Sequence, residues 1–124
     1  MPFREPLLDG CPPQDAPIVA HEVTVYRLTR TLPPTEADFR SQRMEHPVKF
    51  FRDECLARGL SVHAQRLYSE MAAKLPNLKG RHVCPVRLLP DCGHLKRTGT
   101  GHSHHTWWPF AAFDILAHAG QVAA

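Results

Sequence analysis

The sequence lacks the long apolar segments that mark membrane or exported proteins. No run of about 18 apolar residues is present, and the first six residues, MPFREP, open no apolar signal segment. The four cysteines, Cys11, Cys55, Cys84 and Cys92, form no Cys-x-x-Cys pair, which excludes the compact structural zinc motifs. We therefore expect a cytoplasmic protein with free thiols, because disulfides are rare in reducing compartments.

Charge of one sign is also scarce. The chain has 15 basic and 12 acidic residues, a net charge of +3, and no long basic run. Dedicated nucleic-acid binders usually carry a stronger and more clustered positive field. No Ser/His/Asp order and no nucleophile elbow are present, and no glutamate follows Glu70. These absences leave no ready-made hydrolase signature.

What is present suits one small globular domain. The chain has 124 residues, 43% of them hydrophobic, which is enough for a single core. Residues 1–17 hold five prolines and read as an extended arm. Residues 18–124 predict a single compact α+β domain, with a mixed, twisted sheet of about four to six strands and packed helices.

The first half of the domain alternates strand and helix signals. Residues 18–29 predict a strand, and Thr35 with Asp38 three residues later predicts the start of a helix. A second helix is expected from Pro47 to Gly59, with Val48, Phe51 and Cys55 facing the core.

The second half is read in the same way. Residues 60–63 predict a short strand, followed by a helix with Leu67, Met71 and Leu75 on its buried face. Residues 81–89 predict a strand at a sheet edge, since Pro85 cannot donate to a ladder. A strand is expected within 102–109, and a last helix over 110–118 with Phe113, Leu116 and Ala117 facing inward.

Arg27 stands out in the first strand. It would share a face with Val23 and Val25, and a charge on an apolar face is costly unless it is paired or opens into a cleft. Either the strand ends before Arg27, or Arg27 has a specific role.

Residues 94–108 carry the densest chemistry, with four histidines and two tryptophans. Histidine can move protons, bind metal or contact phosphate. On a strand, His105 and Trp107 would share one face, while His104, Thr106 and Trp108 would share the other. One tryptophan is therefore expected in the core. The segment is equally compatible with a polar loop that precedes a buried strand.

Residues of this segment also suggest three narrower functions. The loop Gly99-Thr100-Gly101, after Lys96-Arg97, could hold a phosphate with backbone N–H groups, or it could be a plain turn. Two-histidine phosphoesterases need two His-x-Ser/Thr pairs, and only His104-His105-Thr106 supplies one. Zinc is a third alternative, and it would draw on ligand types without a recognised spacing. Its candidate ligands are Cys84, Cys92, His94, His102, His104 and His105.

Four short strings support a resemblance in the order of elements. They are VYRL at 25–28, GLSVH at 59–63, RHV at 81–83 and HHTWW at 104–108. This layout resembles small ADP-ribosyltransferase-like domains of the toxin or RNA 2′-phosphotransferase type. The late HHTWWP string is also similar to small uncharacterised bacterial proteins, a resemblance that implies no activity.

The ADP-ribosyltransferase resemblance implies an NAD site. Arg27 would hold the dinucleotide phosphates and Ser61 would line the nicotinamide side. His105 or Thr106 would stand at the third catalytic position. The glutamate that such domains usually carry on the late strand is missing, since no glutamate follows Glu70.

We therefore expect binding of NAD or a related nucleotide, with transferase or toxin activity as an extension. Arg27 and Arg97 would contact phosphate, Ser61 would position the ring, His104 or His105 would move protons, and Trp107 or Trp108 would wall the pocket. The alternative is a non-enzymatic interaction protein, such as an immunity, antitoxin or anti-defence factor. A zinc-binding module is a weaker third interpretation.

Overall fold

The fold is built on one antiparallel sheet. The computed structural model describes residues 1–101 and 103–120. Five strands lie in the order β3-β1-β2-β5-β4: β1 (Val23–Thr29), β2 (Leu60–His63), β3 (His82–Leu88), β4 (Gly93–Arg97) and β5 (His104–Pro109). The α+β class and the single domain are confirmed. However, all strand pairs are antiparallel, and the sheet is therefore not mixed. Each strand enters the sheet at the end where the strand beside it leaves, which is the arrangement of antiparallel pairs.

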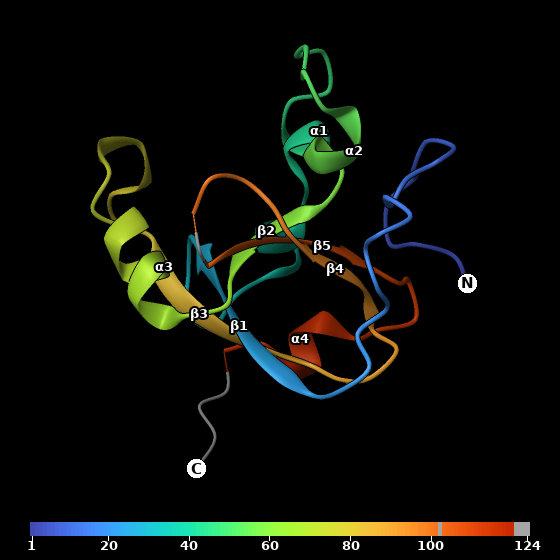
Figure 1. The fold of residues 1–124 in the computed structure, drawn as a ribbon. Coiled ribbons are helices and arrows are strands. Elements are labelled where there is room, and N and C mark those ends of the chain that lie inside the picture. The colour runs from blue at the N-terminus through green and yellow to red at the C-terminus, as the bar shows by residue number, and fades with distance from the viewer. Residues whose placement is uncertain (102, 121–124) are drawn as a thin grey trace.

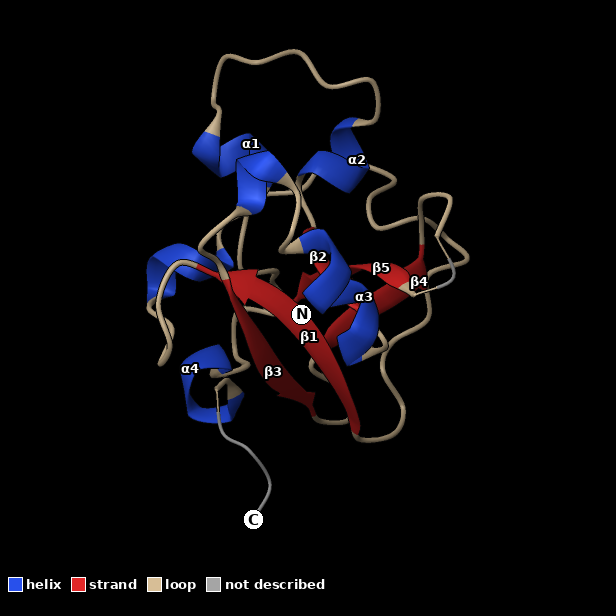
Figure 2. Ribbon diagram, turned by 90° about the vertical axis from the view of Figure 1, so that its left-hand side faces the viewer, coloured by secondary structure: helices blue, strands red, loops and turns tan. Residues whose placement is uncertain are grey.

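The helices are short and lie around this sheet. They are η1 (Glu36–Phe39), α1 (Gln42–Glu45), α2 (Glu54–Ala57), α3 (Arg66–Ala72), η2 (Pro76–Leu78) and α4 (Ile115–His118). Figures 1 and 2 show α1 and α2 together at one end of the molecule and α4 at the other. Among the described residues, no helix is long and apolar enough to cross a membrane.

The core lies on one face of the sheet. Val25, Leu60, Leu88 and Trp107 are all buried there, and Ile115 of α4 packs against them. The register pairs Leu60 with Trp107 across β2 and β5, so the two side chains share this face. The strand expected within 102–109 is confirmed, and its buried tryptophans are part of the folded interior.

Both outer edges of the sheet are covered by the chain itself. Along β4, the N–H of Val19 donates to the carbonyl of Gly93 at 2.9 Å, and the N–H of Leu95 donates to Pro17 at 3.1 Å. Along β3, the N–H of Gly120 donates to the carbonyl of Pro85 at 2.7 Å. The predicted edge position of Pro85 is confirmed, since β3 ends the strand order.

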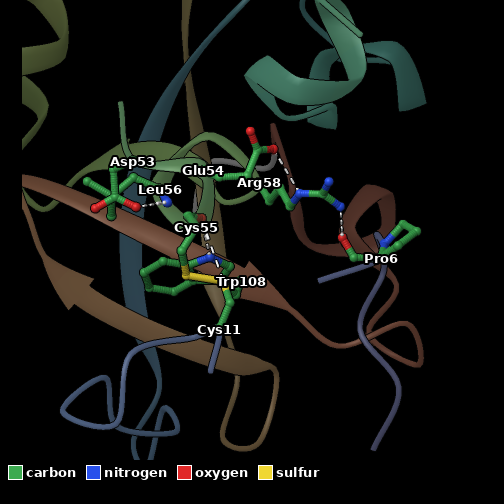
Figure 3. The surroundings of a disulfide bond; sticks show 8 residues. All are labelled: Pro6, Cys11, Asp53, Glu54, Cys55, Leu56, Arg58 and Trp108. Carbon is green, nitrogen blue, oxygen red and sulfur yellow. Dashed lines mark hydrogen bonds and ion pairs between the residues drawn. A yellow bond between two sulfur atoms is a disulfide. The ribbon is translucent and has the colours of Figure 1, made fainter. Parts of the chain in front are cut away.

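The N-terminal arm is joined to α2 by a disulfide between Cys11 and Cys55. The expectation of free thiols is therefore wrong for these two cysteines, while Cys84 and Cys92 are free and buried. Sequence spacing could not reveal the pair, because the two cysteines lie 44 residues apart. Figure 3 shows the bond beside the Trp108 indole, whose Nε1–H donates to the carbonyl of Cys55 at 3.0 Å.

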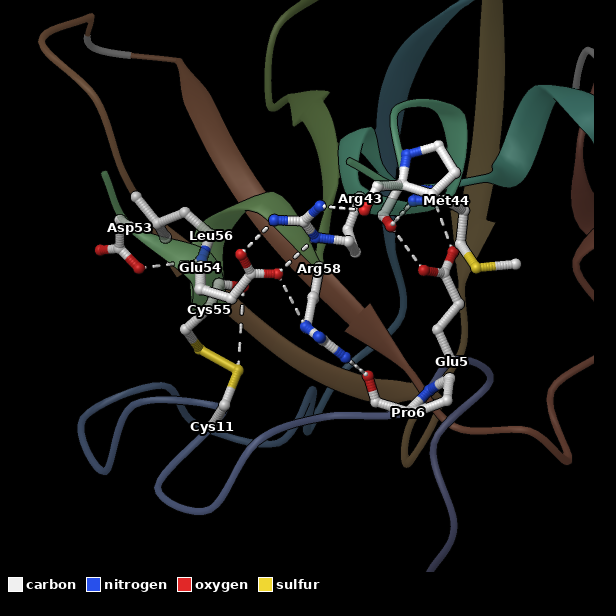
Figure 4. Close-up of polar contacts among 12 residues, drawn as sticks. Glu5, Pro6, Cys11, Arg43, Met44, Asp53, Glu54, Cys55, Leu56 and Arg58 are labelled. Atoms are coloured by element: carbon white, nitrogen blue, oxygen red, sulfur yellow. Dashed lines mark hydrogen bonds and ion pairs between the residues drawn. A yellow bond between two sulfur atoms is a disulfide. The ribbon is translucent and has the colours of Figure 1, made fainter. Parts of the chain in front are cut away.

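Polar contacts reinforce this junction (Figure 4). Glu54 accepts from Arg43 Nε at 2.7 Å and from Arg58 Nε at 2.9 Å, and Arg58 also donates to the carbonyl of Pro6 at 2.8 Å. The hydrogen bond from Arg43 is the main reason that the pKa of Glu54 is lowered to about 2. The backbone N–H of Ser41 donates to Glu5 at 2.9 Å. Arm and helices thus form one unit.

The helix expected from Pro47 to Gly59 is wrong in its first half. Residues 47–53 are not helical, and Val48 is 99% exposed. The helix begins only at Glu54, where the Asp53 carboxylate accepts the N–H of Leu56 at 3.1 Å. A side-chain cap inside the expected helix therefore sets its start.

Two predicted helix faces are also wrong. In α3, Leu67, Met71 and the following Leu75 are exposed, and Ser69 is buried instead. The hydroxyl of Ser69 lies 2.9 Å from His63 Nδ1, so a polar contact sets the buried face of this two-turn helix. In the last helix Ile115 is buried, whereas Leu116 is exposed.

Candidate functional site

A cavity of about 480 Å³ opens on the side of the sheet near η1 and α1. It brings together Arg27, Ser61 and His104, which the sequence placed in three separate segments. The whole lining is Tyr26, Arg27, Leu28, Arg30, Ala37, Asp38, Arg40, Ser41, Gln42, Glu45, His46, Gly59, Ser61, His63, Ala72, Asn77, Leu78, Arg81 and His104. Its volume is in the range of ordinary small-ligand sites.

Arg27 is tied to the backbone rather than open to the cavity. Its Nε–H donates to the carbonyl of Asp38 at 2.8 Å, and its two other nitrogens donate to Ser61 at 2.8 Å and Arg40 at 3.2 Å. Burial is the main reason that its pKa is lowered to about 10, so it stays charged at neutral pH. Strand β1 does include Arg27, and its charge on the apolar face is satisfied by three carbonyls.

His63 and His104 face each other on neighbouring strands. The register pairs them directly, and it pairs Ser61 with Thr106 two positions away. The two imidazole rings meet edge to face, with centroids 5.6 Å apart. Cross-strand partners point to the same face, so β2 and β5 present two histidines and two hydroxyls side by side.

Each of these histidines is held through Nδ1. His63 Nδ1 lies 2.9 Å from the hydroxyl of buried Ser69, which donates to the carbonyl of Tyr26 at 3.4 Å. His104 Nδ1 lies 3.1 Å from the hydroxyl and 3.3 Å from the carbonyl of Thr98. A proton on Nδ1 satisfies the contact of His63 to Ser69 and that of His104 to the Thr98 carbonyl, and in this tautomer each Nε2 keeps its lone pair. Neither Nε2 has a hydrogen-bond partner among residues 1–101 and 103–120.

Burial lowers the pKa of both His63 and His104. Repulsion lowers the pKa further, from His104 and His105 in the case of His63 and from His105 in the case of His104. Near pH 6.5 the unfolded chain therefore binds more protons than the folded chain does. We expect the free energy of unfolding to fall as the pH drops below about 6.5. Urea titrations at several pH values would measure this slope. The H63N/H104N double variant should show a shallower slope, and an unchanged slope would contradict the assignment.

The cationic side chains of the lining are not equally available. Arg30 pairs with Glu45 at 3.4 Å, and Arg40 pairs with Glu36 at 3.0 Å. Arg81 makes no side-chain hydrogen bond or ion pair with the part of the chain that the structure describes. Arg81 is therefore the cation best placed to meet a bound anion.

The acidic side chains of the lining are occupied. One oxygen of Asp38 accepts the N–H of Arg30 at 2.8 Å and the other accepts the N–H of Thr35 at 2.9 Å. The predicted pairing of Thr35 with Asp38 at a helix start is thus confirmed, although η1 is a 3-10 helix. Glu45 faces Arg30. The cavity therefore has a positive balance that suits a phosphate or carboxylate.

Several expected site residues lie elsewhere. Trp107 is fully buried in the core, on the same face as His105, and neither lines the cavity. Arg97 is exposed at the end of β4, where it pairs in register with His105. Thr106 is buried beside the site, and its hydroxyl lies 2.7 Å from that of Thr98. The predicted faces of residues 104–108 are confirmed. Because His105 and Trp107 lie on the opposite face from His104, they do not line the cavity.

Sequence reasoning missed His63 and Arg81. The string Ser61-Val62-His63 reverses the His-x-Ser/Thr order, so it did not register as a partner for His104-His105-Thr106. Antiparallel pairing makes the two strings equivalent, because it places histidine against histidine and hydroxyl against hydroxyl. A search that allowed reversed order would have found the pair.

The proposed zinc ligands do not meet in the described part of the chain. No group of three or more histidine, cysteine or acidic side chains gathers within 1–101 and 103–120. Cys84 and Cys92 are buried, and burial raises the pKa of each thiol to about 11. His94 Nδ1 lies 2.7 Å from the carbonyl of Ala16. His102 lies outside the described residues.

Comparison with known proteins gives no relative from which a function could be taken. No protein-family model matches the chain, and no curated protein and no solved structure does so either.

Proposed function

We propose that the chain binds a phosphate-bearing nucleotide in the cavity beside β2 and β5, with NAD as the leading ligand. The observation that supports this proposal is the gathering of Arg27, Ser61, His104 and Arg81 around one cavity. Arg27 and Ser61 were expected at such a site from the ADP-ribosyltransferase-like layout, and His104 was expected there as a proton donor or acceptor. The positive balance and the volume of the cavity agree with a mononucleotide-sized group.

The roles differ from the sequence expectation in one respect. Arg27 shapes the site by holding the backbone at Asp38, Arg40 and Ser61. Arg81 takes over the phosphate contact, since its guanidinium is unpaired within the described chain. Ser61 is exposed on the cavity side and would contact the ring or ribose.

Transfer of an ADP-ribosyl group is an extension of this proposal. The late strand lines the cavity with His104, whereas the resemblance put His105 or Thr106 at the position of the usual glutamate. The carboxylates of Asp38 and Glu45 are engaged. A nucleotide-binding protein without turnover fits the same residues. Release of nicotinamide separates the two.

The R81A variant is expected to bind NAD about 10- to 100-fold more weakly, the scale of one lost charge-assisted hydrogen bond. Proton NMR of NAD during titration with protein measures both binding and released nicotinamide. The matched control is R87A, because Arg87 is an exposed β3 arginine whose ion pair with Glu22 lies outside the cavity. Equal binding by wild type and R81A would contradict the phosphate role.

A complete absence of line broadening at millimolar NAD would remove NAD from the proposal. The second candidate would then lead: a non-enzymatic interaction protein, such as an immunity, antitoxin or anti-defence factor. One observation favours it, namely that Val48 and Phe50 are 99% and 86% exposed in the segment between α1 and α2. Exposed apolar side chains of this kind occur at protein interfaces. Its signature is stable co-purification with one partner.

The cytoplasmic location expected from the sequence also belongs to this proposal. The Cys11–Cys55 bond gives it a direct test, because glutathione keeps such pairs reduced in the cytoplasm. Protein from its natural compartment should carry four free thiols if that compartment is reducing, and two if it is oxidising.

A further inference from the structure

The cavity contains a pair of groups that nucleotide binding alone does not require. His63 and His104 are opposite each other in register, with ring centroids 5.6 Å apart, and both line the cavity. Each ring is oriented through Nδ1 by a protein oxygen, which leaves Nε2 available. A base held by a second group and directed at a ligand space is the usual geometry of proton transfer in catalysis.

We infer that His63 and His104 act as an acid–base pair that cleaves a ribonucleotide phosphodiester by attack of its own 2′-hydroxyl. This inference rests on the proposed function only in that the same cavity holds the phosphate group. The substrate class is a short RNA phosphodiester, of which the cavity of about 480 Å³ would hold the scissile phosphate with one nucleotide-sized part.

The reaction balances without any further reactant. One imidazole accepts the proton of the 2′-hydroxyl while the 2′-oxygen forms a bond to phosphorus. The phosphorus–O5′ bond breaks, and the other, protonated imidazole donates its proton to the leaving O5′. The products are a 2′,3′-cyclic phosphate and a 5′-hydroxyl, and the pair again holds a single proton.

Neighbouring groups support this division of labour. Arg81, unpaired within the described chain, would stabilise the charge that builds up on the non-bridging oxygens. Ser69 and Thr98 are positioning residues, because they orient the rings and do not themselves line the cavity. The pair shares one proton, so its two pKa values belong to both rings together.

The rate should depend on pH as a bell. The rate requires one neutral and one protonated ring, and burial together with repulsion from neighbouring histidines lowers the pKa of both. The maximum therefore lies below about pH 6.5, and the rate declines toward alkaline pH as the acid is lost. His105 on the opposite face adds to the repulsion. The other charged groups around the cavity are Arg27, Arg30, Asp38, Arg40, Glu45, His46 and Arg81.

The test follows the dinucleoside monophosphate UpA by ³¹P NMR, which resolves the diester from its 2′,3′-cyclic product. Wild-type protein is expected to form the cyclic phosphate, with a pH bell. H63N and H104N should each lose at least about 100-fold in rate, the scale of one general acid or base. Asparagine keeps a donor in place of Nδ1, so the contacts to Ser69 and Thr98 survive while Nε2 is removed.

The control is H21N, since His21 is exposed before β1 and outside the cavity. It should retain the wild-type rate. NAD titration of the same proteins separates the two proposals. NAD binding without cleavage of UpA overturns the acid–base pair alone, and cleavage without NAD binding overturns the NAD proposal alone. Cleavage at the wild-type rate in H63N and H104N overturns the inference. Such activity would come from a contaminating nuclease, whose rate does not depend on these substitutions.

Discussion

R27M is expected to lower the free energy of unfolding by about 2–4 kcal/mol. The substitution removes three hydrogen bonds from one guanidinium to the carbonyls of Asp38, Ser61 and Arg40. A carbonyl left without a donor costs about 1–3 kcal/mol when buried and less when water can reach it. R27M also removes the cost of burying the Arg27 charge, which offsets part of the loss. The total destabilisation therefore stays below the sum of three unsatisfied carbonyls.

Urea denaturation followed by tryptophan fluorescence measures this effect, since both tryptophans are buried. R87M is the matched control, because Arg87 makes an exposed ion pair with Glu22 that should contribute less than about 1 kcal/mol. A lysine in place of Arg27 keeps the charge but cannot reach three carbonyls, so R27K should fall between wild type and R27M. Equal free energies of unfolding for R27M and R87M would show that the three contacts of Arg27 do not stabilise the fold.

Loss of the Cys11–Cys55 bond is the second large expected effect. In the chain-entropy account, opening a loop of 44 residues lowers stability by about 4 kcal/mol. The Arg58 contact to Pro6 and the Ser41 contact to Glu5 remain, so the arm stays folded in water and detaches at lower denaturant concentration. Urea denaturation of the C11S/C55S variant measures the loss.

Reductant provides the control for that measurement. It should destabilise the wild type to the level of C11S/C55S and leave the variant unchanged, because Cys84 and Cys92 are already free thiols. Alkylation under denaturing conditions should label two cysteines before reduction and four afterwards. Four labelled cysteines before reduction would contradict the bond in the protein as purified.

The strands could be predicted from the sequence because alternation reports burial directly. The period of two in 104–108 placed His105 with Trp107 and His104 with Thr106, and the register confirms both faces. β4 (Gly93–Arg97) was missed because its charged and polar residues resemble a loop. It pairs along its whole length with β5, which decides its conformation.

The helices could not be predicted in detail, because they are too short for the spacing of apolar residues to show which face is buried. The i, i+4, i+8 spacing of Leu67, Met71 and Leu75 suited a long amphipathic helix, but α3 has two turns and docks through Ser69. The Val48 and Phe51 stripe failed for the same reason, since the chain there is not helical. Local polar contacts decided both cases.

The candidate site was predicted in part. Arg27, Ser61 and His104 do meet at one cavity, but Arg27 contacts backbone carbonyls rather than open space. His63 became visible only through its cross-strand partner, because sequence adjacency does not reveal antiparallel neighbours.

The covered edges of the sheet bear on how the molecule behaves among copies of itself. An open edge strand offers a row of N–H and C=O groups to a strand from another chain, which is how many sheets begin to polymerise. Here residues 17–19 occupy the outer side of β4, and Gly120 binds the outer side of β3. Residues 17–19 and Gly120 thus occupy part of each outer edge, which limits the pairing of that edge with a strand from another copy. A shortened version that omitted residues 1–19 would present the β4 edge to its neighbours.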